Sequence, residues 1–139
     1  VVQSGPFVSG THQIVWSVSD GNRRVTATQI LKVVPLVTTA VATYADEGVS
    51  ISIAFLLSGE AADYPVTVPF SLSGTAVEGE DYRIDVSDRV TIDKGTRGNF
   101  NLTITADELL EGQETIEISL SSPTNAVAGL PQRQVITMQ

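Results

Sequence analysis

Residues 49–57 read VSISIAFLL, and this stretch decides the fold class. Small residues alternate there with a set of apolar side chains: Val49, Ile51, Ile53, Phe55 and Leu57. Because side chains of an extended strand point alternately to its two faces, these five occupy one face. A strand with one apolar face packs that face against another layer of secondary structure.

The same alternation recurs along the rest of the chain. Four further stretches show it, at residues 66–72, 100–106, 116–120 and 135–138. Clusters of Gly, Pro, Asn and Asp separate these stretches, and no segment combines helical spacing with capping residues. Such a pattern predicts an all-β, antiparallel sandwich with little helix. Pro69 predicts an edge position or a bulge within its strand.

A separate hairpin is expected near the beginning of the sequence. Ile14, Trp16 and Val18 alternate with other residues, and Asp20-Gly21 follows before a return strand at residues 25–34. Asp-Gly between two β-rich runs favours a tight turn with positive φ at both positions. A lone hairpin is marginal in water, so the remaining strands of its sheet are expected outside this sequence or in a neighbouring copy.

Charge divides the chain in the same place. The 139 residues carry 8 basic and 16 acidic side chains, a formal net charge of -8. Residues 1–37 hold three basic residues against one acidic, hence +2, and residues 38–139 hold five against fifteen, hence -10. Pro35 lies between the two zones. We therefore expect an N-terminal β-hairpin over residues 1–36 and a sandwich domain over residues 37–139.

Composition excludes several classes of function. The acidic balance argues against nucleic acid as a partner and favours cations. Cys is absent, which excludes disulfides, thiol catalysis and the common zinc sites. No apolar run approaches the length of a membrane span, so we expect no membrane insertion. His12 is the only histidine, and aromatic residues make up 6% of the chain, so we do not expect an enzyme.

Three loops between the predicted strands combine carboxylates with glycine, at residues 46–48, 74–82 and 107–115. Calcium takes six to eight oxygen ligands from carboxylates, carbonyls and water, and glycine lets the backbone turn such oxygens inward. Alternate loops of a sandwich gather at one end. The pattern therefore predicts a calcium site there. A structural interpretation stays open, in which Asp81 accepts amide hydrogen bonds of its loop, Tyr82 packs, and Glu111 and Glu114 are solvated.

The order of these motifs resembles the Calx-β domain over residues 38–139. Glu47-Gly48 is similar to the acidic entry of that family, and Gly74-Thr75-Ala76 with Gly79, Asp81 and Tyr82 is similar to its GTA-x-x-G-x-DY phrase. The family's acidic hairpin and its L-S-x-P-x-N/G stretch have counterparts in one further set of residues: Asp107, Glu111, Glu114 and residues 121–125. Residues 10–35 resemble the last two strands of immunoglobulin-like repeats in bacterial surface proteins.

The resemblance implies an immunoglobulin-like sandwich of about seven strands that binds calcium at its loop end. Its metal ligands would be Glu47, Asp81, Asp107, Glu111 and Glu114, together with a carbonyl near Leu109. Ala106 stands where an acidic residue is common in the family, and further aspartates follow the last strand in calcium-regulated members. Because the chain reaches Gln139 without them, the site is expected to be incomplete or to be completed beyond that residue.

Two functions of different class follow from these expectations. One is a calcium-binding module of a large extracellular or cell-surface protein, which acts in adhesion or in contacts with matrix or with neighbouring domains. The calcium ion, those neighbouring domains and another protein at the cell surface would then be its partners. The alternative is a passive spacer or protein-interaction module of the same fold without a bound ion. Carbohydrate binding is a weaker third option, because it needs an exposed aromatic patch.

Overall fold

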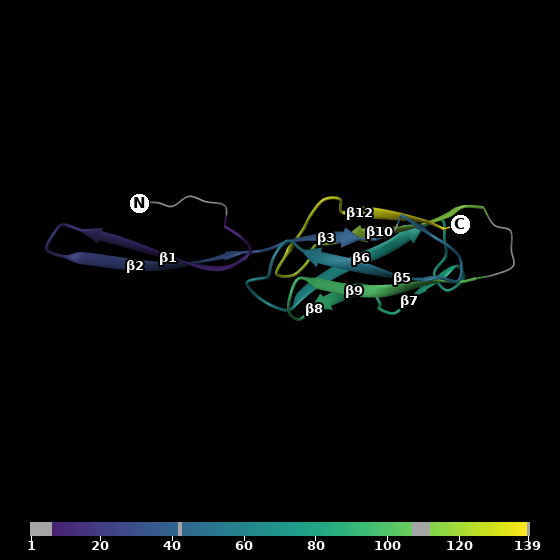
Figure 1. Cartoon of the computed structure of the whole chain (residues 1–139), viewed down its shortest axis with the longest axis horizontal. Helices are drawn as coiled ribbons and strands as arrows, with labels where there is room; N and C mark the ends of the chain where they lie inside the picture. Colours follow the sequence, from purple (N-terminus) through teal and green to yellow (C-terminus); the bar gives the residue numbers. More distant parts are fainter. Residues whose placement is uncertain (1–6, 42, 107–111, 139) are drawn as a thin grey trace.

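The computed structural model describes residues 7–41, 43–106 and 112–138, which form strands and loops and no helix. Within these ranges, then, nothing has the length and apolar character of a membrane-spanning helix. Figure 1 shows an elongated molecule in which a two-stranded hairpin projects from one end of a sandwich of two sheets. The predicted all-β sandwich with an additional N-terminal hairpin is confirmed.

The hairpin consists of β1 (Gly10–Ser19) and β2 (Arg24–Val33), which pair without interruption along their whole length. Its loop has four residues, 20–23, and Asp20 lacks the positive φ that was predicted for both Asp20 and Gly21. The side chain of Asp20 closes this longer loop, because its Oδ1 accepts the backbone N–H groups of Asn22 at 2.9 Å and Arg23 at 2.7 Å. These hydrogen bonds lower the pKa of Asp20. Only Gly21 in the loop has a positive φ, of 96°.

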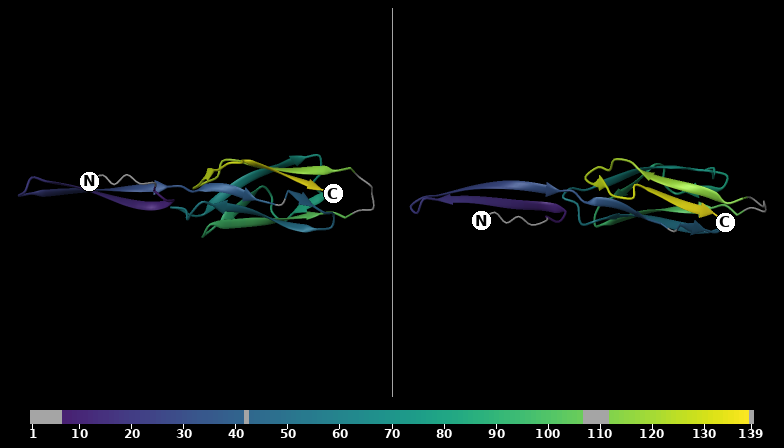
Figure 2. Two further views of the ribbon diagram at one scale, coloured as in Figure 1. Left: turned by 45° about the horizontal axis from the view of Figure 1, so that its top comes forward. Right: turned by 90° about the horizontal axis from the view of Figure 1, so that it is seen from above.

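The sandwich has two sheets of five strands each, seen edge-on in Figure 2. The first has the order β4-β12-β10-β6-β8, with the bounds Tyr44–Ala45, Arg133–Met138, Glu114–Leu120, Val66–Gly74 and Arg89–Ile92. The second has the order β11-β3-β5-β9-β7, with the bounds Val127–Ala128, Leu36–Ala40, Ser50–Leu57, Arg97–Ile104 and Tyr82–Ile84.

Three details differ from the sequence-based expectation. The described part of the sandwich has ten strands and not about seven, because β4, β7 and β11 are pieces of two or three residues at sheet edges. Two of these pieces pair in parallel, β11 with β3 and β4 with β12, so the sheets are not purely antiparallel. Strand β6 lies between β10 and β8, not at an edge. Pro69 is accommodated because the ladder with β10 ends at Phe70, one residue further along the strand.

The core lies between the two sheets and is built from the alternating residues that the sequence indicated. Phe55 of β5, Phe70 of β6 and Phe100 of β9 pack together at its centre. The rings of Phe70 and Phe100 are stacked, with centroids 4.6 Å apart and planes 8° from parallel. Aliphatic side chains surround them, and the fully buried ones are Val37, Ile53, Val66, Val68, Ile92, Leu102, Ile104, Ile116, Ile118 and Ile136.

The hairpin joins the sandwich through one continuous path of the chain. Strand β2 runs into β3 across a buried Pro35, whose carbonyl accepts the N–H of Val127 at 2.9 Å. Lys32 also forms an ion pair with Asp63 at 2.8 Å. Among the described residues, the buried hydrophobic core begins at Val37 and includes no residue of the hairpin. That the hairpin belongs to an immunoglobulin-like repeat stays a prediction.

Candidate functional site

The described parts of the predicted loops meet at the end of the sandwich that lies away from the hairpin. Residues 46–48 connect β4 to β5 there, and Gly48 has a φ of +73°. A Cβ on Gly48 would stand 3.3 Å from the Cβ of Ala106, so the first loop packs directly against the residue that precedes 107–111. The N–H of Ile104 donates to the carbonyl of Val49 at 2.9 Å and ties the same two segments together.

Asp81 connects the second loop, residues 74–82, to the segment at the end of β9 that contacts the first loop. Its backbone carbonyl accepts the N–H of Thr105 at 2.8 Å, so the loop at 74–82 lies beside the end of β9. Its side-chain Oδ2 accepts the N–H of Val77 at 2.6 Å, and its own N–H donates to the carbonyl of Val77 at 2.9 Å. One carboxylate oxygen of Asp81 therefore holds the loop in shape. Its side chain is half-buried.

The GTA phrase joins the second loop to the start of β10. The N–H groups of Thr75 and Ala76 both donate to the carbonyl of Thr115, at 3.0 and 3.2 Å. In return, the N–H of Thr115 donates to the hydroxyl of Thr75 at 2.9 Å. Ala106, which precedes 107–111, and Thr115, near the start of β10, are thus held at the end of the sandwich where residues 46–48 and 74–82 lie.

The structure describes three of the five predicted ligands. Glu47 is exposed, Asp81 is half-buried, and Glu114 begins β10 opposite Met138 of β12. Asp107 and Glu111 lie outside the described residues. Within the described ranges no three Asp, Glu or His side chains come close enough together to hold a metal ion. The five-residue calcium site therefore stays a prediction, whose centre would depend on residues 107–111.

One acidic residue of the same loop was not singled out from the sequence. The backbones of Glu78 and Tyr82 form an isolated parallel β-bridge, and both residues lie in the turn that Asp81 closes. The phenol of Tyr82 is buried, with 3% of the residue exposed. Desolvation raises its pKa above the ordinary value, and the nearby charges of Glu78 and Asp81 raise it further. The run Glu78-Gly79-Glu80-Asp81 was the available signal, but only Asp81 matches the family phrase.

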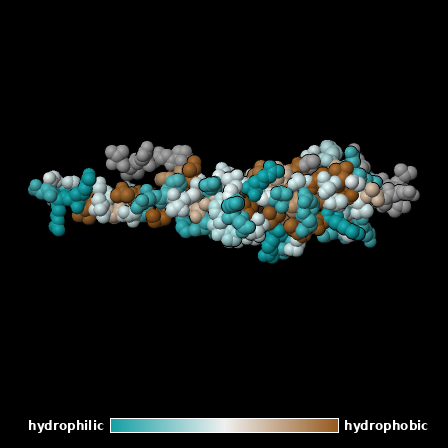
Figure 3. Space-filling view, turned by 60° about the horizontal axis from the view of Figure 1, so that its bottom comes forward, coloured by the Kyte–Doolittle hydropathy of each residue, from teal (hydrophilic) through white to brown (hydrophobic). Residues whose placement is uncertain are grey.

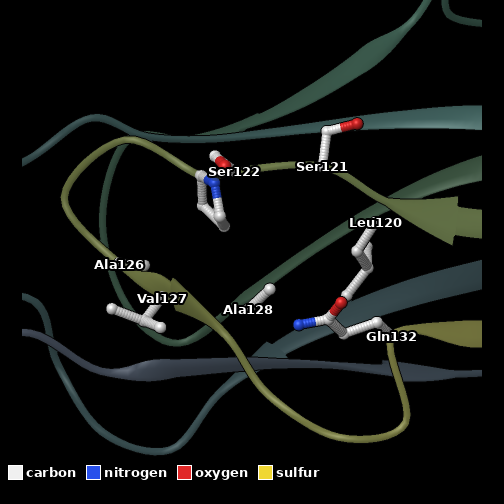
Figure 4. Close-up of a pocket in the computed structure, with 8 residues that line it drawn as sticks. Leu120, Ser121, Ser122, Ala126, Val127, Ala128 and Gln132 are labelled. Carbon is white, nitrogen blue, oxygen red and sulfur yellow. The ribbon is translucent and has the colours of Figure 1, made fainter.

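A pocket of about 370 Å³ opens at the other end of the sandwich, near the junction with the hairpin (Figure 4). Its lining contains no ionisable side chain and consists of Leu120, Ser121, Ser122, Pro123, Ala126, Val127, Ala128 and Gln132. Such a lining supplies neither carboxylates for a cation nor a base for catalysis. The Nε2 of His12 lies 2.7 Å from the carbonyl oxygen of Val8, and its ring contacts the ring of Phe7.

No protein-family model and no curated protein matches this sequence. Among solved structures, the chain is similar to the crystal structure of CBD12 from CALX1.2, with a TM-score of 0.60 and 17% identity. That match covers 69% of this chain, which spans only 40% of the CBD12 structure. The crystal structure of the apo-form Calx CBD1 domain matches 76% of this chain and 96% of its own length, with a TM-score of 0.56 and 14% identity.

A cohesin module from the family 33 glycoside hydrolase of Clostridium perfringens ATCC13124 also matches, at 10% identity and with coverage of 76% of this chain and 97% of its own. Its TM-score of 0.43 is too low to support an argument. The two Calx structures both match with TM-scores above 0.5, and at 17% and 14% identity what they show is the fold. The sandwich of this chain therefore has the Calx-β fold.

Proposed function

We propose that this chain is a calcium-binding β-sandwich module of a large extracellular or cell-surface protein. In this proposal a calcium ion binds at the loop end of the sandwich and makes that end rigid, so that the module holds a defined contact with a neighbouring domain or with another surface protein. The module has no catalytic role. Its action in adhesion or matrix contact follows from mechanical support and not from chemistry.

The convergence of the loops carries this proposal. The hydrogen bond from Thr105 to Asp81 and the contact of Gly48 with Ala106 bring residues 46–48, the turn at 81 and the entry to 107–111 to one place. Each of these three loops contains carboxylates in the sequence. Several carboxylates held at one end repel one another, and a divalent cation relieves that repulsion.

The residues fit calcium in the type of atom they offer, but the described ones do not complete a site. Asp81 uses Oδ2 to accept the N–H of Val77, which leaves Oδ1 for a cation, and Glu47 is exposed at the same end. Calcium requires six to eight oxygens, so Asp107, Glu111 and the backbone between them would have to supply much of the remainder. Glu78 is a further candidate, since it lies in the loop of Asp81.

Thermal unfolding of the 139-residue chain in EDTA, in millimolar calcium and in millimolar magnesium tests the proposal. Calcium at 100 times its dissociation constant is expected to add about 2.7 kcal/mol to the free energy of unfolding. For a domain of this size, each kcal/mol of added stability is expected to raise the unfolding temperature by roughly 4 °C. We expect the rise with calcium and little change with magnesium, which prefers a smaller, octahedral site.

Matched variants assign the effect to the loop end. Asp81→Asn keeps an oxygen for the N–H of Val77 but removes the charge, so it is expected to lower the calcium response without unfolding the domain. Glu47→Gln and Glu111→Gln are expected to act in the same direction. Asp93→Asn is the control, because it removes one exposed charge from the loop between β8 and β9, at the hairpin end. Equal calcium stabilisation of all four variants and the parent chain would show that the ligands are wrong.

The alternative is a spacer or interaction module with the same fold and no bound ion. The hydrogen bond between Asp81 and Val77 favours it specifically, because it gives the carboxylate a structural role that needs no cation. In that case calcium leaves the unfolding temperature of the parent chain and of every loop variant unchanged. Asp81→Asn then has only the small effect expected of a weakened hydrogen bond.

A further inference from the structure

The register of β1 and β2 divides the hairpin into two unlike faces. Directly paired residues project to the same side of a sheet, so one face carries Trp16 with Ala27 and Val18 with Val25. The same face continues toward the sandwich with Ile14, Leu31 and Val33. The opposite face is mostly Thr, Ser, Gln, Arg and Lys, although it includes Val15 and Ile30. We call the first of these the apolar hairpin face.

This face is uncovered over its outer half. Val18 is 74% exposed, Val25 66% and Trp16 46%, and brown residues are visible along the hairpin in Figure 3. Near the sandwich, the chain before β1 adds two more exposed apolar residues, Phe7 and Val8, beside His12 of the same face. A two-stranded sheet with a bare apolar face is marginally stable alone and gains stability from a second layer.

Charge differs between the two ends of the hairpin. Arg23 and Arg24 lie at its tip and form no ion pair within the described ranges, where the only acidic neighbour in the loop is Asp20. At its base the sandwich presents Glu60, together with Asp63, whose charge Lys32 already pairs. Glu60 lies close to the chain before β1, because a Cβ on Gly59 would meet the hydroxyl of Ser9. The tip is therefore basic and the base is acidic.

We propose that a second copy of this chain covers the apolar hairpin face. The two hairpins stack face to face in opposite directions about a two-fold axis, so that the tip of each lies against the base of the other. Val18 and Val25 of one copy then pack on Phe7 and Val8 of the other. In the same arrangement the loop residue Arg23 approaches Glu60, whereas Arg24, which is paired with Ser19, projects from the opposite face of the hairpin. The two-fold axis makes the Arg23–Glu60 contact occur twice.

The dimensions of the hairpin allow this arrangement and limit its strength. Ten residues at about 3.4 Å each give strands of about 34 Å, so an antiparallel stack brings tip to base without a gap. Two strands about 4.8 Å apart make a narrow face, well below the roughly 800 Å² per partner of standard stable interfaces. The dimer is accordingly weak and depends on protein concentration. Its formation also depends on salt, because the Arg–Glu contacts are exposed to solvent.

Sedimentation velocity of the 139-residue chain between about 5 and 500 μM, in EDTA, tests the proposal apart from any calcium effect. We expect dissociation constants in the micromolar range or weaker. Trp16 is the only tryptophan, so its fluorescence is expected to shift to shorter wavelength as the dimer forms. Val18→Lys places a charge in the stacked face and is expected to weaken dimerisation at least about tenfold.

Two sets of controls make the test specific. Val15→Lys is the matched control, since Val15 is 59% exposed on the opposite face of the same strand and its replacement is expected to leave the dimer intact. Arg23→Glu is expected to weaken the dimer, and the addition of Glu60→Arg is expected to restore it, whereas Arg24→Glu is expected to have little effect because Arg24 lies on the opposite face. A circular dichroism spectrum and an unchanged unfolding temperature of the sandwich confirm that each variant is folded.

Three results would overturn the proposal. One is a monomer at every concentration with solvent-exposed Trp16, which would leave the face to a sheet of another protein or of a longer chain. Another is a dimer that Val15→Lys disrupts as strongly as Val18→Lys, which would place the contact elsewhere. The third is a failure of Glu60→Arg to restore the charge-reversed tip. None of these results depends on whether calcium binds, so the two proposals fail separately.

Discussion

The Cα of Gly74 lies so close to the backbone of Thr115 that a Cβ on Gly74 would stand 2.1 Å from the carbonyl oxygen of Thr115. Gly74 also has a φ of +127°, a conformation that residues with a side chain rarely adopt. This approach lets the carbonyl of Thr115 accept the N–H groups of Thr75 and Ala76. The glycine at the head of the GTA phrase thus fixes where the loop at 74–82 leaves the sheet.

Gly74→Ala is expected to destabilise the domain strongly. The new methyl group would meet a backbone oxygen, which cannot move aside as a flexible side chain can, and the positive φ adds strain. We expect the free energy of unfolding in urea to fall by about 3 kcal/mol. Gly79→Ala is the matched control, since Gly79 has a φ of +93° but no atom near its Cβ position. It is expected to cost only about 1 kcal/mol, and equal losses would contradict the steric argument.

Asp81 supplies a second prediction, which concerns the fold without calcium. In EDTA, Asp81→Ala removes the acceptor of the Val77 N–H and is expected to lower the free energy of unfolding by about 1–2 kcal/mol. Asp81→Asn keeps an acceptor and is expected to cost less than half of that. Urea unfolding of the two variants measures the difference. If both lose the same amount, the hydrogen bond is not what holds the turn.

The core supplies a third prediction. Phe70 and Phe100 come from different sheets, and their stacked rings join the two layers. Phe100→Ala is expected to cost about 3–5 kcal/mol, because Phe100 is fully buried. In a double-mutant cycle with Phe70→Leu and Phe100→Leu, we expect a coupling energy of about 0.5–1.5 kcal/mol. A coupling near zero would mean that the rings contribute only through the area they bury.

Sequence and structure agree where a periodic pattern specified the outcome. The alternation in residues 49–57 predicted β5 and its buried face from Ile51 to Leu57, because a period of two admits only one assignment when one face is apolar. Val49 of the predicted face lies before the strand and is exposed. The four-residue loop of the hairpin was not predictable from Asp20-Gly21, since a side-chain hydrogen bond of Asp20 selected it over the shorter turn. The short strands β4, β7 and β11 were missed as well, because two or three residues carry no period. Strands β3 (Leu36–Ala40) and β8 (Arg89–Ile92), of five and four residues, were also missed.

The candidate site shows the same division. The sequence indicated which loops are acidic, and the fold placed those loops together because alternate connections of a sandwich share one end. That Asp81 accepts the N–H of Val77 in particular could not be predicted from the sequence. The structural interpretation did predict that Asp81 accepts amide hydrogen bonds of its own loop. Glu78 was overlooked because its relation to Tyr82 depends on the turn and not on a pattern of residues.

Tyr82 supplies the last prediction, which concerns alkaline pH. Burial and the charges of Glu78 and Asp81 raise the pKa of Tyr82 in the folded chain above its ordinary value near 10. Above that pH the unfolded chain releases the phenol proton while the folded chain keeps it. Because the unfolded state then binds fewer protons, stability falls as the pH rises through the folded pKa, and the stabilising contribution is complete below about pH 10.

Tyr82→Phe removes this group, so the variant is expected to lose less stability than the parent chain between pH 9 and 11 in parallel urea titrations. Tyr44→Phe is the control, since Tyr44 is 65% exposed, and its alkaline loss is expected to equal that of the parent. Absorbance at 295 nm follows the phenolate directly. If the Tyr82→Phe variant and the parent lose stability in parallel, the buried phenol and its two acidic neighbours do not control the alkaline limit of the fold.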